Sequence, residues 1–274
     1  MATVHDSDLD VVLTEPVVRR PASPGATARW AAAIYIISGV PAGFSVFVLL
    51  KLVVRRDPAA TAANILGSEG LFRLGFVCDI IGILLVVISV LLLYELFKPV
   101  NARRALLVAF FVVIGSAIQA LDSLADSAAL IMLKGGGGLE AFSTGQAQSL
   151  AFALLRMHTL VYNLALVFYG VGFIVLGTLV RQSIFLPRII GVPLMIDGLG
   201  YITFSLATFL SPPFAAHLYP ILPFSTAVLG EGSLMLWLLV KGVDAQRWET
   251  QAAAAAWLTR SPAHATTPRQ SSSK

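Results

Sequence analysis

The stretch Leu71–Phe97 reads LFRLGFVCDIIGILLVVISVLLLYELF, and most of its side chains are apolar. A helix that crosses a bilayer needs about 20 predominantly apolar residues, which this stretch supplies. Asp79 lies inside the apolar run, and Lys98 follows its end. The stretch therefore predicts a membrane-spanning helix that carries an acidic side chain within the bilayer.

The rest of the chain follows the same pattern. Its mean hydropathy is +0.83, and 57% of its residues are hydrophobic while 12% are charged. A soluble globular protein carries about 25% charged residues, so an ordinary soluble domain is excluded. Five further segments are long and apolar enough to span: Trp30–Val54, Arg104–Leu133, Ser149–Val180, Arg188–Leu210 and Pro220–Lys241. We expect an all-α polytopic transmembrane helical bundle with six spans.

The basic residues predict the orientation of these spans. If the N-terminus is cytoplasmic, thirteen Lys and Arg residues lie on the cytoplasmic side and five on the other. Cytoplasmic loops are enriched in Lys and Arg, so both termini are expected in the cytoplasm. Lys51, Arg55 and Arg56 favour the opposite orientation. Because the basic residues are scattered at the ends of spans, they give no nucleic-acid footprint.

The chain divides into a polar N-terminal tail at 1–27, a membrane domain at 28–243 and a C-terminal tail at 244–274. The first tail lacks the pattern of a secretory signal. The second contains an alanine-rich stretch that can be helical and a disordered end. Between spans we expect a short surface helix in 57–70, a flexible connection at 135–148 and an irregular cap at 211–223.

Several short motifs occur in a fixed order along the chain. They are Arg29, Tyr35, Gly43-Phe44, Ala62–Leu66, Ser68-Glu69, Leu71–Gly75, Leu93-Tyr94, Lys98–Asn101, Phe168–Gly170, Leu186–Gly191, Gly198–Tyr201, Gly230-Glu231 and Leu236–Gly242. In these motifs the chain resembles the bacterial integral membrane family catalogued as domain of unknown function 4386. The resemblance covers residues 28–243 and implies a multi-span protein of the bacterial inner (plasma) membrane. It implies no activity.

Seven ionisable residues lie within the expected spans: Asp79, Asp122, Asp126, Arg156, His158, Asp197 and Glu231. A charge at the bilayer centre costs about 2.5–3.5 kcal/mol even on insertion scales, so such residues face a bundle interior and mark functional sites. In one reading they form a polar cluster in the outer half of the bundle that binds or conducts a small ligand, ion or proton. In the other they hold the helices together through interhelical hydrogen bonds.

The spacing of these residues suggests individual roles. Asp126 and Arg156 are expected at similar depth on consecutive antiparallel helices, where they would form a structural ion pair. Glu69 and Arg73 would lie at the outer rim. The candidate ligand-binding residues are Asp79, Asp122, His158, Asn163, Asp197 and Glu231.

Known active-site patterns do not account for these residues. The histidines are too dispersed for a recognisable metal site, and no cofactor motif is present. We therefore favour a non-enzymatic binding or conducting protein whose partners are the lipid bilayer and a small ligand or ion. An assembly protein and an intramembrane enzyme stay open as alternatives. Gly39 and Gly43 allow close helix packing, which fits packing within the chain better than a homo-oligomer.

Overall fold

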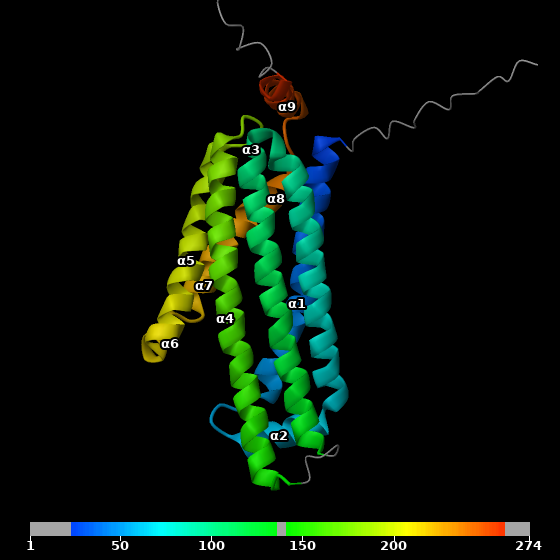
Figure 1. The fold of residues 1–274 in the computed structure, drawn as a ribbon, viewed down its shortest axis with the longest axis vertical. Helices are drawn as coiled ribbons and strands as arrows, with labels where there is room; N and C mark the ends of the chain where they lie inside the picture. The colour runs from blue at the N-terminus through cyan, green and yellow to red at the C-terminus, as the bar shows by residue number, and fades with distance from the viewer. Residues whose placement is uncertain (1–22, 136–140, 261–274) are drawn as a thin grey trace, which may run out of the picture.

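The computed structural model describes residues 23–135 and 141–260, and every element in these ranges is helical (Figure 1). In chain order the elements are α1 (Pro24–Leu52), α2 (Pro58–Gly67), α3 (Glu69–Lys134), α4 (Thr144–Gln182), the 3-10 turn η1 (Arg188–Ile190), α5 (Gly191–Leu210), α6 (Pro212–Leu218), α7 (Ile221–Ala227), the π-helical turn η2 (Val228–Gly232), α8 (Ser233–Val240) and α9 (Ala245–Arg260). The all-α prediction is confirmed for these residues.

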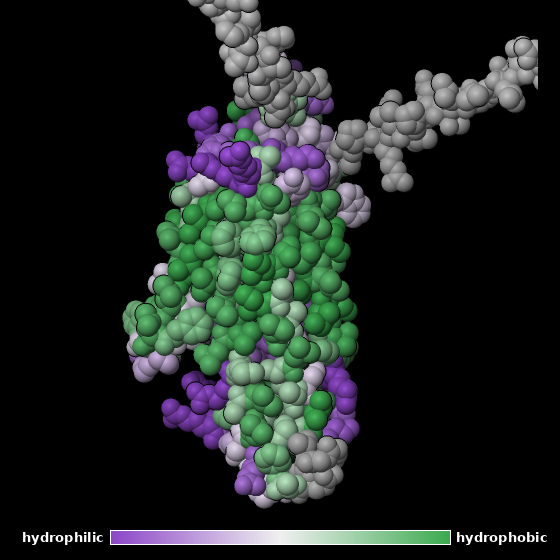
Figure 2. Space-filling view, in the orientation of Figure 1, coloured by the Kyte–Doolittle hydropathy of each residue, from purple (hydrophilic) through white to green (hydrophobic). Residues whose placement is uncertain are grey.

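Within residues 23–135 and 141–260, five helical segments are long and apolar enough to cross a membrane: α1, α3, α4, η1 with α5, and α7 with η2 and α8. Figure 2 shows an apolar belt across the face in view, with hydrophilic side chains gathered above and below it. Large apolar side chains are exposed along this belt, for example Leu84, Leu106 and Leu121. In water such a surface would be unstable, so its solvent is the hydrocarbon of a bilayer.

The second and third expected spans are the two helical arms of α3, which together cover 66 residues. Its backbone is non-helical at Asn101, where φ is −161° and ψ is 104°, and the chain reverses there (Figure 1). Pro99 cannot donate the hydrogen bond that would continue the first arm. The Asn101 side-chain oxygen accepts a 3.0 Å hydrogen bond from the backbone N–H of Arg104 and so begins the second arm. The two ends of α3 meet where Lys134 contacts Glu69 at 3.0 Å.

The connections differ in how well the sequence predicts them. The expected surface helix in 57–70 is confirmed as α2, which Asp57 begins by accepting a 2.9 Å hydrogen bond from the backbone N–H of Ala60. The expected irregular cap at 211–223 is wrong, because it contains α6 and the start of α7. Pro212 occupies the first position of α6, where a missing N–H is not needed. Residues 136–140 of the glycine-rich connection lie outside the described residues.

The helices have unequal lengths, and this decides where the site lies. α4 packs against both α3 and α5, while α1 packs against α3 and α8. The arms of α3 and the 39-residue α4 extend to the end occupied by α2, whereas the 20-residue α5 ends before it (Figure 1). Both ends of the described chain lie at the opposite end, next to the bend of α3.

The alanine-rich stretch is helical as expected and belongs to α9. Trp248 of α9 donates a 2.8 Å hydrogen bond from Nε1 to the backbone carbonyl of Leu96, near the bend of α3. Asp244 begins α9 by accepting from the backbone N–H of Arg247 at 3.1 Å. The predictions for residues 1–22 and 261–274 lie outside the described residues.

Candidate functional site: two polar clusters and a cavity

The first polar cluster lies between the two arms of α3 and α4, and we call it the α3–α4 cluster. It consists of Asp79, Gln119, Asp122, Ser123, Asp126 and His158. The second arm of α3 supplies four of these residues because positions 119, 122, 123 and 126 recur at helical spacing and share one face. Asp122, Ser123 and Asp126 are accordingly buried between the helices.

Asp79 is the hydrogen-bond acceptor that joins the two arms. Ser123 donates to its Oδ2 at 2.5 Å, and Gln119 donates from Nε2 to its Oδ1 at 3.4 Å. Gln119 in turn accepts a 2.9 Å hydrogen bond from the hydroxyl of Tyr169, whose oxygen lies 3.2 Å from that of Ser116. A connected chain of polar side chains thus runs from Asp79 to α4.

The partner of Asp126 is His158, not Arg156. His158 Nδ1 lies 3.2 Å from Asp126 Oδ2 and 3.9 Å from Asp122 Oδ1. The Arg156 side chain is exposed and forms no ion pair with the residues that the structure describes. Two residues along a helix correspond to a rotation of about 200°, so Arg156 and His158 cannot both face α3. The predicted Asp126–Arg156 pair is replaced by a histidine–carboxylate contact.

Several buried polar atoms near this cluster have no hydrogen-bond partner among the described residues. They are Asp122 Oδ2, Asp126 Oδ1, His158 Nδ1 and Asn163 Oδ1. The amide of Asn163 donates to the backbone carbonyl of Thr159 at 2.8 Å, within its own helix. Buried polar atoms are nearly always satisfied in native proteins. The unpaired atoms show that the cluster is only partly satisfied by its own side chains.

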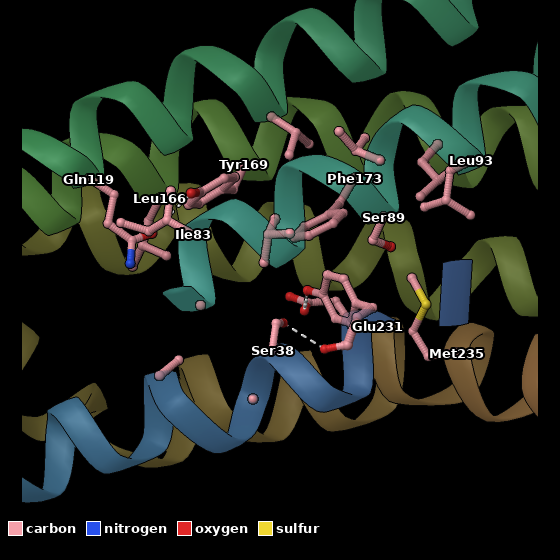
Figure 3. A pocket seen from close by; sticks show the side chains of 18 of the residues that line it. Ser38, Ile83, Ser89, Leu93, Gln119, Leu166, Tyr169, Phe173, Glu231 and Met235 are labelled. Atoms are coloured by element: carbon pink, nitrogen blue, oxygen red, sulfur yellow. Dashed lines mark hydrogen bonds between the residues drawn. The ribbon is translucent and has the colours of Figure 1, made fainter. Parts of the chain in front are cut away.

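A cavity of about 260 Å³ lies between α1, α3, α4, α5 and η2 (Figure 3). Gln119 and Tyr169 line one end, Leu93 and Met235 line the other, and Glu231 lies between them. The other lining residues are mostly apolar. Ligand pockets have this character: a largely apolar wall with a few placed polar groups.

Glu231 is the one residue with a charge-bearing side chain among the described residues that line the cavity. Tyr201 donates a 2.7 Å hydrogen bond to its Oε1, and Tyr35 donates to its Oε2. Tyr201 belongs to α5 and Tyr35 to α1, so these two helices and the element that carries Glu231 meet at one carboxyl group. Glu231 itself belongs to the π-helical turn η2. Such turns are rare and occur frequently at functional sites.

Asp197 lies beside Glu231 and is fully buried. Both of its carboxyl oxygens lack a hydrogen-bond partner among the described residues. Gly230 allows this approach, because a Cβ added there would lie 2.5 Å from the Cβ of Asp197. Only glycine therefore lets η2 pack so closely against α5.

The structure divides the predicted site into two parts. Asp79, Asp122 and His158 belong to the α3–α4 cluster, whereas Asp197 and Glu231 lie beside the cavity. A helical rise of 1.5 Å per residue places Asp79 about 33 Å from Asn101, near the far boundary of a hydrocarbon core about 30 Å thick. It places Glu231 about 15 Å from Lys241, near the middle. The depths differ because α3 and α4 extend past the ends of α5 and α7.

The predicted rim residues lie at the end of the bundle near α2. Glu69 accepts from Arg73 Nε at 2.8 Å and from Lys134 Nζ at 3.0 Å. Arg73 and Lys134 are exposed and Glu69 is half-buried, so solvent screens both contacts. They tie the two ends of α3 together and lie outside the cavity lining.

Sequence reasoning missed the tyrosines. Tyr35, Tyr162, Tyr169 and Tyr201 all line the cavity. A tyrosine inside an apolar span carries a hydroxyl that needs a partner, and this signal could have found them. The sequence motifs contained Tyr35, Tyr169 and Tyr201, but gave no reason to connect them with Glu231.

These features define a class: a polytopic α-helical membrane protein with a cavity inside its bundle. The chain belongs to the family described as Domain of unknown function (DUF4386), whose family model matches residues 30–242. This confirms the resemblance stated from the motifs. No curated protein and no solved structure matches the chain.

Proposed function

We propose that the protein binds a small organic cation inside the membrane, in the cavity that Glu231 lines. The observation that carries this proposal is a single carboxyl group in a mostly apolar cavity of about 260 Å³. An apolar wall selects an apolar body, and a carboxylate selects a positive charge. The ligand class is therefore a molecule with an amine or quaternary ammonium group on a hydrophobic frame.

The aromatic lining supports a cation over a neutral ligand. Tyr35, Tyr162, Tyr169, Phe173 and Tyr201 surround the same space as Glu231. The faces of aromatic rings attract ammonium groups, and aromatic cages recognise quaternary ammonium ligands in other proteins. The hydroxyl groups of Tyr35 and Tyr201 also donate hydrogen bonds to Glu231 and so orient its carboxyl group.

The proposal includes a topology of six crossings with both termini in the cytoplasm, which hydropathy and the basic residues predict, in the bacterial inner membrane that the family resemblance implies. In this topology the two arms of α3 are separate crossings, and both ends of the described chain lie beside the bend that joins them. Lys98, Arg103 and Arg104 at this bend favour the cytoplasmic side. Access to Glu231 from the α2 end would then be access from outside the cell.

We assign the α3–α4 cluster a structural role. The cavity lining does not include Asp79, Asp122, Asp126 or His158. Ser123 and Gln119 instead connect the two arms through Asp79. His158 lies close to a carboxylate, as an intramembrane enzyme would require, but it is not part of the cavity wall. This distribution favours binding over catalysis.

Isothermal titration calorimetry on the full chain in lipid nanodiscs tests the proposal. The probe is benzyltrimethylammonium, and the control ligand is neopentylbenzene, in which a carbon replaces the charged nitrogen. Empty nanodiscs correct for partition into lipid. We expect the cation to bind the wild type at least about tenfold more tightly than the neutral isostere, a difference of about 1.4 kcal/mol.

Two variants test whether Glu231 causes the preference for the cation over the neutral isostere. Glu231→Gln is expected to remove it, because the amide carries no charge. Glu249→Gln removes an exposed carboxylate on α9 and is expected to keep it. Equal cation preference in wild type and Glu231→Gln would refute the proposal.

A further inference from the structure

Asp197 and Glu231 form a pair of carboxyl groups near the middle of the bundle. Gly230 brings their backbones together, since a Cβ there would lie 2.5 Å from Asp197 Cβ and 3.0 Å from its Oδ2. Asp197 is fully buried, and both of its oxygens lack partners among the described residues. The cavity therefore has two acidic groups at one wall, one lining it and one directly behind.

The groups facing this pair include no base. α1 contributes Tyr35, α4 contributes Tyr162 and Tyr169, and α5 contributes Tyr201. The cavity-lining residues of α3 and α8 are not titratable. No Lys, Arg or His is among the described residues that line the cavity.

Two adjacent buried carboxyl groups without a cationic partner cannot both be ionised, because like charges repel and burial disfavours each charged form. An uncompensated charge at this depth is unfavourable as well. The empty cavity is therefore expected to hold the pair as neutral acids. A bound cation changes this balance, because it compensates one negative charge.

Tyr35 and Tyr201 favour the ionisation of Glu231 when a cation binds. An ionised carboxylate only accepts hydrogen bonds, and each oxygen of Glu231 already faces one hydroxyl donor. These two donors stabilise the carboxylate when it forms. Glu231 is accordingly the member of the pair that ionises, and Asp197 keeps its proton.

We propose that the cavity exchanges a proton for the cation: binding of an organic cation releases one proton from the Asp197–Glu231 pair. The inference rests on the proposed function above. The O–H bond of Glu231 breaks, the proton leaves to bulk solvent, and the carboxylate remains with the ammonium group. The net charge of the site is the same before and after the exchange.

Calorimetry of the wild type in phosphate and in Tris tests the exchange, because these buffers differ in their heat of protonation. We expect the observed heat of benzyltrimethylammonium binding to depend on the buffer with a slope of about one proton released per cation. The affinity for the cation is also expected to rise by up to about tenfold per pH unit for as long as the ligand-free pair is neutral, since the proton competes with the cation.

The controls separate the two proposals. Neopentylbenzene should bind with a heat that does not depend on the buffer, and Glu249→Gln should release the same proton as wild type. Cation binding with a buffer-independent heat would overturn the exchange and leave the proposed function standing. Absence of cation binding would overturn both. Equal proton release by the neutral isostere would place the proton elsewhere and overturn the exchange.

Discussion

Glu231 accepts hydrogen bonds from two hydroxyl groups on two different helices. Each bond to a charged group contributes about 1.5–3 kcal/mol, so the two tyrosines can compensate part of the cost of a carboxylate inside the bundle. Neither oxygen of Asp197 has a hydrogen-bond partner among the described residues, and the nearby Thr226 hydroxyl donates to the backbone carbonyl of Leu222 instead. The two neighbouring acids therefore differ in which form their surroundings favour, and this difference gives them separate roles.

His158 makes the contact that the sequence suggested for Arg156. We expect His158→Ala to lower the free energy of unfolding by about 1–3 kcal/mol, because the imidazole 3.2 Å from Asp126 and 3.9 Å from Asp122 is then lost. Arg156→Ala is expected to change it by less than about 0.5 kcal/mol, since its side chain is exposed. Unfolding titrations with sodium dodecyl sulfate measure both. A larger loss for Arg156→Ala than for His158→Ala would contradict the assignment.

The sequence predicts at this scale which residues are buried, but not which of them meet. Asp122 and Asp126 could be placed on one inward face from their spacing alone. Whether Arg156 or His158 contacts Asp126 depends on how α4 is rotated about its axis. The sequence does not define that rotation, because apolar residues occur on all sides of a membrane-spanning helix. The same ambiguity hid the link between Tyr35 and Glu231, which are far apart in the chain.

α4 and α5 pack through glycines that face each other. A Cβ at Gly198 would lie 2.3 Å from the carbonyl oxygen of Gly170, and one at Gly191 would lie 2.4 Å from that of Gly177. Small residues let two membrane helices approach closely, and dispersion contacts then stabilise the pair. This seam holds α5 in the position from which Tyr201 lines the cavity and Asp197 lies behind its wall.

Gly198→Ala tests the seam. The added methyl group would overlap the backbone of Gly170 and the side chain of Ile174, so we expect a loss of about 1–3 kcal/mol in the free energy of unfolding. Gly43→Ala is the matched control, because a Cβ there meets nothing within 4 Å. The same unfolding titration compares them. A Gly198→Ala variant as stable as Gly43→Ala would show that the close contact is not required.

Length and hydropathy predict most helices, because a span must be long and apolar whatever its neighbours are. They do not predict the π-helical turn at 228–232, which depends on how Gly230 packs against Asp197. They also predict the two arms of α3 as separate spans, because the polar residues at the bend interrupt the apolar run. α2 was predictable since Asp57 and Pro58 are a typical helix start.

At the scale of the whole molecule, the unequal lengths of the helices separate the α3–α4 cluster from the carboxyl groups of Asp197 and Glu231. The long arms of α3 and α4 carry the α3–α4 cluster to the boundary of the apolar belt, whereas the shorter α5 and α8 keep Asp197 and Glu231 near its middle. The cavity extends from Glu231 toward Gln119, and so toward that cluster (Figure 3). The sequence showed seven ionisable residues in spans, but their depths could not be compared without the true ends of the helices.

The most direct measurement is a crystal structure of the protein in a lipidic mesophase, grown with 4-iodobenzyltrimethylammonium. Iodine gives an anomalous signal that locates the ligand independently of the protein phases. We expect one anomalous peak inside the cavity, with the ammonium group next to Glu231 and between Tyr35 and Tyr201. A cavity filled by repacked side chains, or a peak only on the outer surface of the apolar belt, would contradict this expectation.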